Sequence, residues 1–461
     1  MEKQIDLNKY RHLYKFSWTW KILSYYVIFL HKLFYKNIIV EGLENIPKDG
    51  PLIFAPNHQN ALMDPLAVLF TCNRQIVFMA RADVFKNKFI ASILHFLKII
   101  PVFRIRDGKE NLANNDITFN IAVKVLESKQ NVGIFPEAKH TNKRRLLDLK
   151  KGIPRLAFLA EEKNNFELEI KIIPVGIYYS NYNKMRGVLH VRYGNPIKVS
   201  DLKNEYLNTP QKAYLTLRDR IEEELRPLMI DIRSLELYDM YESLRTFNVK
   251  NLIRKFKFGK INQLNKFKAD KITIKALETY EKEYPEKMLE IKNLLDKYEL
   301  LKSKYKISNQ SVEKPKLSLF RMGLNTLIML VCLPFFIYGL INNLFVYFIP
   351  QFLVKKIKDK QFHSSVKFVW AVFVIPVFYI LQTLIFGIFS NNIWLTLSYF
   401  ISLPLSGLLA RVILEWYDTF IQDWRVLLLR KFNPNDYETI KQIHKNLELE
   451  LDLIINHWNR S

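Results

Sequence analysis

Two long runs without a formal charge, residues 322–354 and 368–410, constrain this chain more than any other feature. The second run would be about 65 Å long as a helix, about twice the thickness of a bilayer's hydrocarbon core. It therefore predicts two membrane-spanning helices, with residues 390–392 as the turn between them. The first run is too long for one upright helix and short for two. Asn342-Asn343, near its centre, favours a hairpin or a re-entrant pair.

Basic residues flank both apolar runs, and such flanks favour the cytoplasmic side of a membrane. They are Lys314, Lys316 and Arg321, then Lys355, Lys356, Lys358, Lys360 and Lys367, and finally Arg411. We therefore expect each run to enter and return on the same side. This predicts a multi-pass membrane protein with a transmembrane domain of two hairpins over residues 316–412, and with the domain over residues 41–200 on the cytoplasmic side. Residues 413–461 should form an amphipathic tail, with a helix over 435–458.

The net charge of +24 over 461 residues raises nucleic acid as a partner. No aromatic RNA-binding signature, zinc-ligand spacing or DNA-reading helix accompanies it. Much of the basic excess lies beside apolar segments, as expected next to an anionic membrane surface. We therefore expect a lipid membrane as partner and no nucleic acid. Cys72 and Cys332 lie far apart in sequence, so we expect neither a disulfide framework nor a metal site.

The N-terminal region, residues 1–40, contains an aromatic and apolar stretch over 16–35. Lys21, His31 and Lys32 interrupt it, whereas a clean transmembrane helix needs about 20 apolar residues in a row. An interfacial helix fits better, with its tryptophans at the depth of the lipid headgroups. An ordinary buried amphipathic helix is the alternative.

Between residues 41 and 200, strand-like runs alternate with helical stretches, which favours a layered α/β domain. The predicted strands are 76–80, 99–103, 131–135, 170–177 and 188–193, and the predicted helices lie near 84–97, 114–128 and 152–162. Residues 201–315 are charged and helical in pattern. A long amphipathic helix over 276–304, interrupted by Pro285, is expected in this spacer, which shows no chemistry of its own.

One histidine is presented on a turn between a strand and a helix. The short apolar run 52–55 reads as a buried strand, and Asp64-Pro65 reads as a helix start, with Asp64 as N-cap. His58 lies between them. A neutral imidazole can take a proton from a hydroxyl, and a nearby carboxylate can fix its tautomer. His58 is thus a candidate base and Asp64 its orienting partner. The alternative is that Asp64 only caps a helix and His58 only fills a turn.

Asn57-His58 with Asp64 downstream resembles the catalytic block of the glycerolipid acyltransferases, the family of the 1-acylglycerol-3-phosphate acyltransferases. Three segments that resemble the family's later blocks follow in order, at residues 98–104, 133–137 and 172–176. The resemblance covers roughly residues 40–200. It implies an α/β acyltransferase domain, a mixed sheet flanked by helices, followed here by the helical spacer and the C-terminal α-helical transmembrane domain.

This chain departs from the family pattern at two places. Five residues, where the family has four, separate His58 from Asp64, so the turn must bulge or the pair must meet differently. In the third block, Ala138 stands where the family has glycine. An alanine there is strained if that glycine normally has a positive φ. His140 also departs from the family pattern, and it follows Glu137 by three residues.

The resemblance also implies roles for residues of the second block. Arg104 is the first choice for binding the substrate phosphate, because a planar guanidinium can bind phosphate bidentately. Arg106 lies two residues on, hence on the same face if the strand continues. A solvated arginine at a strand end is the alternative for either of them.

The third and fourth blocks supply the remaining candidate site residues. Glu137 would accept a hydrogen bond from a glycerol hydroxyl or hold a basic neighbour. Lys151-Gly152 resembles a Lys-Gly feature that follows the third block in this family, after a basic run at 143–145 that could equally be a surface patch. Pro174 would shape the strand beside the acyl slot.

The function implied is a membrane acyltransferase for phospholipid synthesis. It would move a fatty acyl group from an acyl thioester, acyl-CoA or acyl-carrier protein, to the hydroxyl of a lysophosphatidate-type acceptor, with no metal and no cofactor. Glycerol-3-phosphate is the alternative acceptor. A non-catalytic membrane scaffold that keeps the fold is the alternative from another class. A chain ending near residue 315 is expected to keep some activity.

Overall fold

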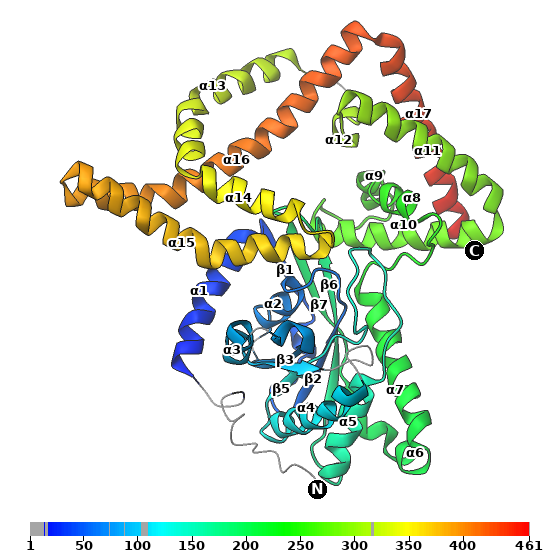
Figure 1. The fold of residues 1–461 in the computed structure, drawn as a ribbon. Coiled ribbons are helices and arrows are strands. Elements are labelled where there is room, and N and C mark those ends of the chain that lie inside the picture. Colours follow the sequence, from blue (N-terminus) through cyan, green and yellow to red (C-terminus); the bar gives the residue numbers. More distant parts are fainter. Residues whose placement is uncertain are drawn as a thin grey trace. The chain divides into compact units, whose positions relative to one another are not determined.

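The computed structural model describes residue 13 and residues 17–72, 74–86, 88–102, 109–314 and 318–460. Figure 1 shows the ribbon with its elements labelled. The chain forms two compact units. The first comprises Met1–Asp231 together with Leu353–Val372, and the second comprises Ile232–Phe352 together with Phe373–Ser461. The first unit therefore extends beyond residue 200 and takes in a short segment from the far side of the first apolar run.

An eight-stranded mixed sheet forms the centre of the first unit, as predicted. Its order is β1-β7-β6-β2-β5-β3-β4, with β8 paired to β6. Strand β2 is parallel to both β5 and β6, β3 is parallel to β5 and β4, and β7 is antiparallel to β6. The strands are β1 (Asn37–Glu41), β2 (Leu52–Pro56), β3 (Ile76–Arg81), β4 (Ile99–Val102), β5 (Asn131–Gly133), β6 (Lys171–Tyr179), β7 (Val188–Tyr193) and β8 (Ile197–Lys198).

Helices cover both faces of this sheet. Successive side chains of a strand point to opposite faces, so apolar residues at consecutive positions need a covering layer on each side. Ile53 of β2 belongs to one apolar core, and its neighbour Phe54 belongs to the other. Every residue of β2 is buried, as expected for a central strand covered on both faces. The helices are α1 (Trp18–Phe34), α2 (Met63–Leu69), α3 (Lys88–Phe96), α4 (Lys109–Glu127), α5 (Gly152–Lys163), α6 (Lys203–Asn208) and α7 (Pro210–Leu225).

The predicted strands and helices of this domain are confirmed to within a few residues where the structure describes them. The predicted helix start, with Asp64 as N-cap and Pro65 as first helical residue, is wrong by two residues. Helix α2 begins at Met63 with Leu62 as its N-cap residue, so Asp64 lies inside the first turn. Its carboxylate is consequently available to other partners.

The second unit is helical. Helix α10 ends at Glu283 and α11 begins at Pro285, which confirms the predicted interruption, since proline is accommodated at the first position of a helix. The predicted C-terminal helix is also confirmed, and α17 packs along α10 and α11. The helices are α8 (Tyr238–Leu244), α9 (Val249–Lys255), α10 (Gln263–Glu283), α11 (Pro285–Tyr305), α12 (Asn309–Val312), α13 (Leu319–Asn342), α14 (Leu344–Lys355), α15 (His363–Ser390), α16 (Ile393–Phe432) and α17 (Pro434–Trp458).

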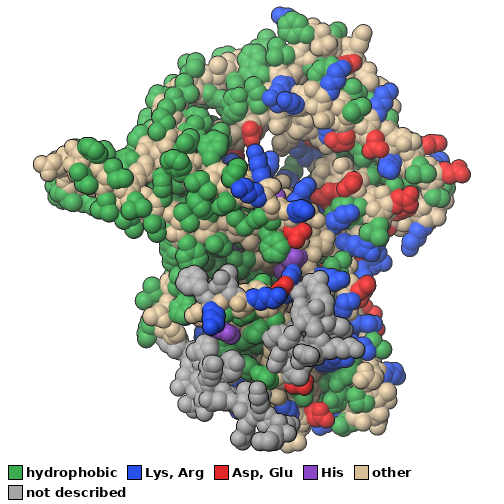
Figure 2. All heavy atoms as spheres, in the orientation of Figure 1, with side chains coloured by type: hydrophobic (Ala, Val, Ile, Leu, Met, Phe, Trp, Pro, Cys, Tyr) green, Lys and Arg blue, Asp and Glu red, His purple; other side chains and the backbone are tan. Residues whose placement is uncertain are grey.

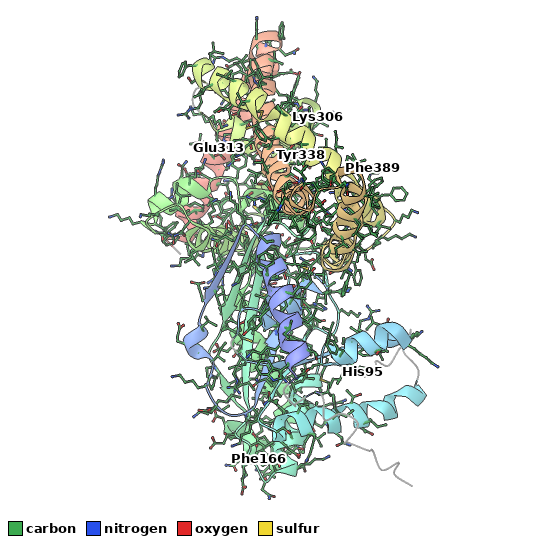
Figure 3. The ribbon with its side chains drawn as sticks, turned by 90° about the vertical axis from the view of Figure 1, so that its left-hand side faces the viewer. His95, Phe166, Lys306, Glu313, Tyr338 and Phe389 are labelled. Carbon is green, nitrogen blue, oxygen red and sulfur yellow. The ribbon has the colours of Figure 1, made fainter. Side chains whose placement is uncertain are left out.

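Three helices in the described part of the chain have the length and apolar composition needed to cross a membrane, namely α13, α15 with the turn before it, and α16. Hydrophobic side chains gather over these helices, shown green in Figure 2. Phe389, near the end of α15, is labelled in Figure 3 and is 84% exposed. This large exposed apolar surface indicates membrane association.

The helix breaks fall close to the predicted turns. Helix α13 ends at Asn342, and α15 and α16 are separated by Asn391 and Asn392. The first apolar run is divided unequally, into a helix of 24 residues and one of 12. Helix α16 runs on to Phe432, so the chain has no break at the expected boundary between residues 412 and 413.

Candidate active site

The candidate site lies at the edge of the sheet where β6, β2 and β5 end side by side. His58 follows β2, Glu137 follows β5, and Tyr179 is the last residue of β6. Because these three strands are parallel, their carboxyl ends meet at one edge, where open α/β sheets bind their ligands. Three segments that are distant in sequence therefore bring their polar side chains together here.

The structure brings His58 and Asp64 into direct contact. The imidazole Nδ1 lies 2.8 Å from Asp64 Oδ2, and the His58 side chain is 17% exposed whereas Asp64 is fully buried. A carboxylate is an acceptor only, so Nδ1 carries the proton and Nε2 is left as the basic nitrogen. The pair thus has the arrangement expected of a base and its orienting carboxylate.

The additional residue between His58 and Asp64 is accommodated by an unusual backbone conformation. Ala61 has φ 42°, in the left-handed region that L-residues rarely adopt. The turn bulges there, and the contact between the two side chains still forms. Of the two outcomes that the sequence left open, the structure shows the bulged turn.

Asp64 holds the whole turn, not only the imidazole. Its Oδ2 also accepts the N–H groups of Gln59 and Asn60, each at 2.7 Å, and its Oδ1 accepts the hydroxyl of Tyr179 at 2.8 Å. Hydrogen bonds from several donors offset the cost of burying a carboxylate. Asp64 is therefore an anchor for the segment that carries His58.

Glu137 accepts two backbone N–H groups in this structure. Its Oε1 accepts the N–H of His58 at 2.8 Å, and its Oε2 accepts the N–H of Leu147 at 2.9 Å. The side chain is 1% exposed, and burial raises the pKa of its carboxyl to about 8 against the opposing effect of these two N–H groups. In this structure Glu137 fixes the backbone of His58 to the loop after β5.

The residues after Glu137 adapt to their unusual sequence. Ala138 has φ 54°, so alanine stands at a position that glycine would occupy without strain. The His140 ring lies 5.1 Å from the His58 ring, centroid to centroid. Burial is the largest cause that lowers the pKa of His140, to about 4. A neutral imidazole therefore lies beside His58 at physiological pH.

Three further residues support the site although sequence reasoning gave them no role. The Phe135 ring stacks on His58 with centroids 4.0 Å apart. The Asn57 side chain exchanges two hydrogen bonds with the backbone of Ile177 in β6. Tyr179 holds Asp64. Phe135 and Asn57 lie inside the family-like blocks, close in sequence to Glu137 and His58, and this proximity could have marked them as site residues. For Tyr179 the sequence offered no such mark except its place at the end of a strand.

The basic residues divide into two groups. Arg104 and Arg106 lie outside the described residues, after β4, whose last residue Val102 is paired with Arg81 at the end of β3. Arg144 belongs to the run 143–145, for which a surface patch was one of two open alternatives, and it is 2% exposed. Its guanidinium donates to the carbonyl of Tyr179 at 2.8 Å and lies over the Tyr178 ring. Arg144 therefore belongs to the interior of the site.

The remaining predicted residues lie further along the same loops. Lys151 is the N-cap residue of α5 and Gly152 is its first residue, and the preceding N–H of Lys150 donates to the carbonyl of Pro136 at 2.8 Å. Pro174 is buried in β6 beside Ala55 of β2. Among the residues that the structure describes, no group of three His, Cys, Asp or Glu side chains could hold a metal ion.

Comparison with known proteins identifies the domain around this site. Residues 37–178 match the family model described as Acyltransferase. The chain is 27% identical over 203 residues to the 1-acyl-sn-glycerol-3-phosphate acyltransferase of Borreliella burgdorferi, covering 42% of this chain and 73% of that protein. It is 27% identical over 138 residues to glycerol-3-phosphate O-acyltransferase 1 of Saccharomyces cerevisiae, covering 29% of this chain and only 18% of the yeast protein.

A solved structure is also similar to this chain. It is the 1-acyl-sn-glycerophosphate (LPA) acyltransferase of Thermotoga maritima, with 21% identity and a TM-score of 0.34, covering 45% of this chain and 78% of that one. The family model and the curated relatives confirm the recognition made from the four blocks. This chain contains an acyltransferase domain of the glycerolipid type, and it is an O-acyltransferase.

Proposed function

We propose that this protein transfers a fatty acyl group from an acyl thioester to the free hydroxyl of a lysophosphatidate-type acceptor at a membrane. The observation that carries the proposal is the His58–Asp64 contact of 2.8 Å at the carboxyl edge of the sheet. The turn that bears His58 is held by Asp64 and Glu137, so the imidazole is presented in one orientation. A fixed base next to a bound hydroxyl accelerates a transfer by about 10²–10⁴-fold.

The reaction follows from the protonation states of the site. Nε2 of His58 takes the proton of the acceptor hydroxyl while the oxygen attacks the thioester carbonyl. The carbon–sulfur bond then breaks, and the departing thiolate takes the proton back from the imidazolium. Asp64 stabilises the imidazolium between these two steps. The donor is acyl-CoA or an acyl-carrier protein, and the cycle needs no metal and no cofactor.

Two lines of support favour lysophosphatidate over glycerol-3-phosphate. The Borreliella relative is named for 1-acylglycerol-3-phosphate, and the match spans 73% of its length. A Bacillus subtilis relative of the same name matches over 55% of its length. The two yeast relatives named for glycerol-3-phosphate match over 18% and 15% of theirs. Glycerol-3-phosphate remains the second candidate because these two yeast relatives are named for it.

The phosphate of the acceptor would be bound by Arg104, with Arg106 as the alternative. Both follow β4, which ends at the same edge of the sheet as β2 and β5. Lys151 and Gly152 begin α5 after the loop that leaves Glu137, and a helix start with a lysine is suited to an anion. Pro174 would shape the acyl slot from within β6.

The acceptor and product are lipids, and two features would keep the enzyme at the membrane. Helix α1 exposes one apolar face, formed by Trp18, Ile22, Tyr25 and Phe29, each more than half exposed. These side chains would lie in the headgroup region, as expected for an interfacial helix. Helix α13, the part of α15 after Val372 and the apolar part of α16 would be embedded in the bilayer, with α14 beside them.

The path of α13 and α14 follows from where the chain emerges. No helix long enough to cross a membrane precedes α13 in the described part of the chain, and residues 353–372 belong to the catalytic unit. We propose that both ends of the α13–α14 pair lie on the same side as the catalytic unit, which would be the cytoplasmic side. Helix α13 is about 36 Å long, but α14 is about 18 Å, too short for a crossing of roughly 30 Å. The pair would be re-entrant.

Purified protein in vesicles should be offered lysophosphatidate and glycerol-3-phosphate, each with acyl-CoA and with acyl-carrier protein. We expect product from lysophosphatidate with one donor at least tenfold above that from glycerol-3-phosphate. The reverse ratio would assign the second acceptor, and no transfer to either would remove the proposed function.

Membrane topology is tested separately, with single cysteines at positions 359, 391 and 415. Thiol reagents should reach 359 and 415 from the cytoplasmic side and 391 from the opposite side. Labelling of 359 from outside would mean that 322–354 crosses once, and the re-entrant arrangement would be wrong.

A further inference from the structure

The segment Leu353–Val372 is part of the catalytic unit although it lies between two apolar stretches of the sequence. Phe368 and Val372 are 2% and 6% exposed and belong to the apolar core on one face of the sheet. The Phe368 ring meets that of Phe34 edge to face, with centroids 5.7 Å apart. The segment is therefore packed into this unit, and it does not merely link two membrane helices.

The start of α15 makes polar contacts with the loops around His58. The hydroxyl of Ser365 accepts the N–H of Leu62 at 3.1 Å, and Ser364 donates to the carbonyl of Tyr182. Lys367 donates to the carbonyl of Asn183 at 2.9 Å. Just before the helix, Phe362 lies edge-on against His140, with centroids 4.9 Å apart. These contacts all reach the segments that surround the catalytic pair.

The Leu62 N–H has a particular need for such a partner. Leu62 is the N-cap residue of α2, and the first N–H groups at a helix start have no acceptor within the helix. Neighbouring N–H groups of the turn are satisfied locally: those of Gln59 and Asn60 by Asp64, and that of Met63 by the Asn60 carbonyl. Leu62 directly follows Ala61, the residue at φ 42°.

We infer that Ser365 is a positioning residue for the acyl-transfer site. Its hydroxyl supplies the acceptor that the bulged turn needs, and so holds Ala61 and Leu62 where the His58–Asp64 contact can form. The additional residue in the turn and the serine more than 300 positions later thus act together. The effect on turnover rests on the proposed function, whereas the effect on the turn does not.

One consequence concerns the shortened chain considered from the sequence. A chain ending near residue 315 lacks Ser365, Phe368 and the rest of the segment Leu353–Val372. The expectation that it keeps activity is therefore replaced by the opposite one, because the turn would lose an acceptor and the core would lose buried side chains.

The test uses the full-length protein in vesicles, with Ser365→Ala, the conservative Ser365→Thr, and Ser406→Ala as a matched control. Ser406 is also a largely buried helical serine, but its hydroxyl bonds only to Leu403 in its own helix. We expect Ser365→Ala to lower kcat about tenfold, the factor that corresponds to the loss of one hydrogen bond. Both KM values should stay within about twofold of wild type. Ser365→Thr should recover most of kcat, and Ser406→Ala should match wild type.

Amide hydrogen exchange over residues 57–66 gives a second readout that needs no turnover. Exchange there should be about tenfold faster in Ser365→Ala and unchanged in Ser406→Ala. Unchanged exchange in Ser365→Ala would overturn the inference, as would a kcat equal to wild type on an acceptor that the wild type uses. A wild type without transfer activity would refute the proposed function alone, since exchange would still decide the role of Ser365.

Discussion

The candidate active site and the apolar helices bury polar groups in different ways. In the catalytic unit the buried groups Asp64 and Glu137 are ionisable, and both accept backbone N–H groups from the turn that carries His58. Among the apolar helices the buried group is a neutral amide. Asn343 is fully buried, donates to the carbonyls of Gly339 and Leu403, and accepts the Tyr379 hydroxyl at 2.5 Å.

The difference reflects what each region must do. A carboxylate can be buried beside a sheet edge because several N–H donors replace its water, and its charge then orients a base. A charge among lipid-facing helices has a high energetic cost, so neutral side chains hold these helices together. Close approach serves the same end: a Cβ on Gly339 would lie 2.4 Å from the Ser406 carbonyl oxygen. The polar groups around His58 prepare chemistry, and those buried among the apolar helices hold helices in contact.

The largest expected effect is that of His58→Ala, which would show that the first unit's polar groups serve catalysis. Turnover should fall at least about 100-fold, because the general base is lost, while the protein stays folded and membrane-bound. The control is His190→Asn, since His190 is also buried and paired with a carboxylate, Glu41, but lies on β7. Near-normal turnover in His58→Ala would show that the pair is structural.

Arg104→Ala should raise KM for the phosphorylated acceptor about 10- to 100-fold, the effect of losing one charge-assisted hydrogen bond. KM for the acyl donor should change little, because only the acceptor carries the phosphate that Arg104 binds. The matched control is Arg106→Ala. If Arg106→Ala has this effect and Arg104→Ala does not, the phosphate is bound by the second arginine.

Glu137→Gln should lower kcat about tenfold, because an amide has one oxygen whereas each of the two carboxyl oxygens accepts an N–H group, from His58 and from Leu147. Glu161→Gln is the control. This carboxyl is also buried, but it accepts the N–H of Ile170 and not that of His58. It should lose stability and keep kcat. Equal loss of kcat in both variants would mean that Glu137 acts only through stability.

His31→Phe separates burial from function within the first unit. His31 is fully buried among the rings of Tyr35, Phe70 and Phe368, with no hydrogen-bond partner among the described residues, and burial lowers its pKa to about 3. Between pH 6.5 and about 3, His31 is therefore protonated in the unfolded state but not in the folded state. The free energy of unfolding falls as the pH falls through this window. At pH 5 the loss is about 2 kcal/mol.

The variant should remove that loss and keep the edge-to-face packing. Thermal unfolding in detergent at pH 7 and pH 5 measures it, and kcat at pH 7 should be unchanged. An equal fall in melting temperature for wild type and variant between these two pH values would contradict the assignment.

Asn343→Leu tests the second unit and has the smallest effect. Stability in detergent should fall by about 1 kcal/mol, the size of interhelical hydrogen bonds in membranes, with kcat unchanged. Thr326→Leu is the control, since the Thr326 hydroxyl bonds only within its own helix, to the Met322 carbonyl. A large loss of turnover in Asn343→Leu would show that the two units are functionally coupled and would break the contrast drawn between them.

Much of the fold could be predicted because its signals are local. Charge-free runs, the alternation of strands and helices, and the helix interruption at Pro285 all depend on neighbouring residues, and the structure has these elements where expected. His58 and Asp64 were paired on the same basis, since only a turn separates them. The spacing implied either a bulged turn or a different contact between the pair, and the structure decided for the bulge at Ala61.

Only the tertiary structure decided what depends on residues far apart in sequence. Glu137 faces the backbone of His58 because β2 and β5 are neighbours in the sheet, which no local pattern records. Arg144 lies in a basic run that could equally be a surface patch by sequence. It is buried, and its guanidinium donates to the carbonyl of Tyr179 at the end of β6. Ser365 reaches Leu62 because the chain returns to the catalytic unit after its first apolar run. Hydrophobic periodicity determines which segments are buried, whereas the partner of each buried polar group is set by how those segments pack.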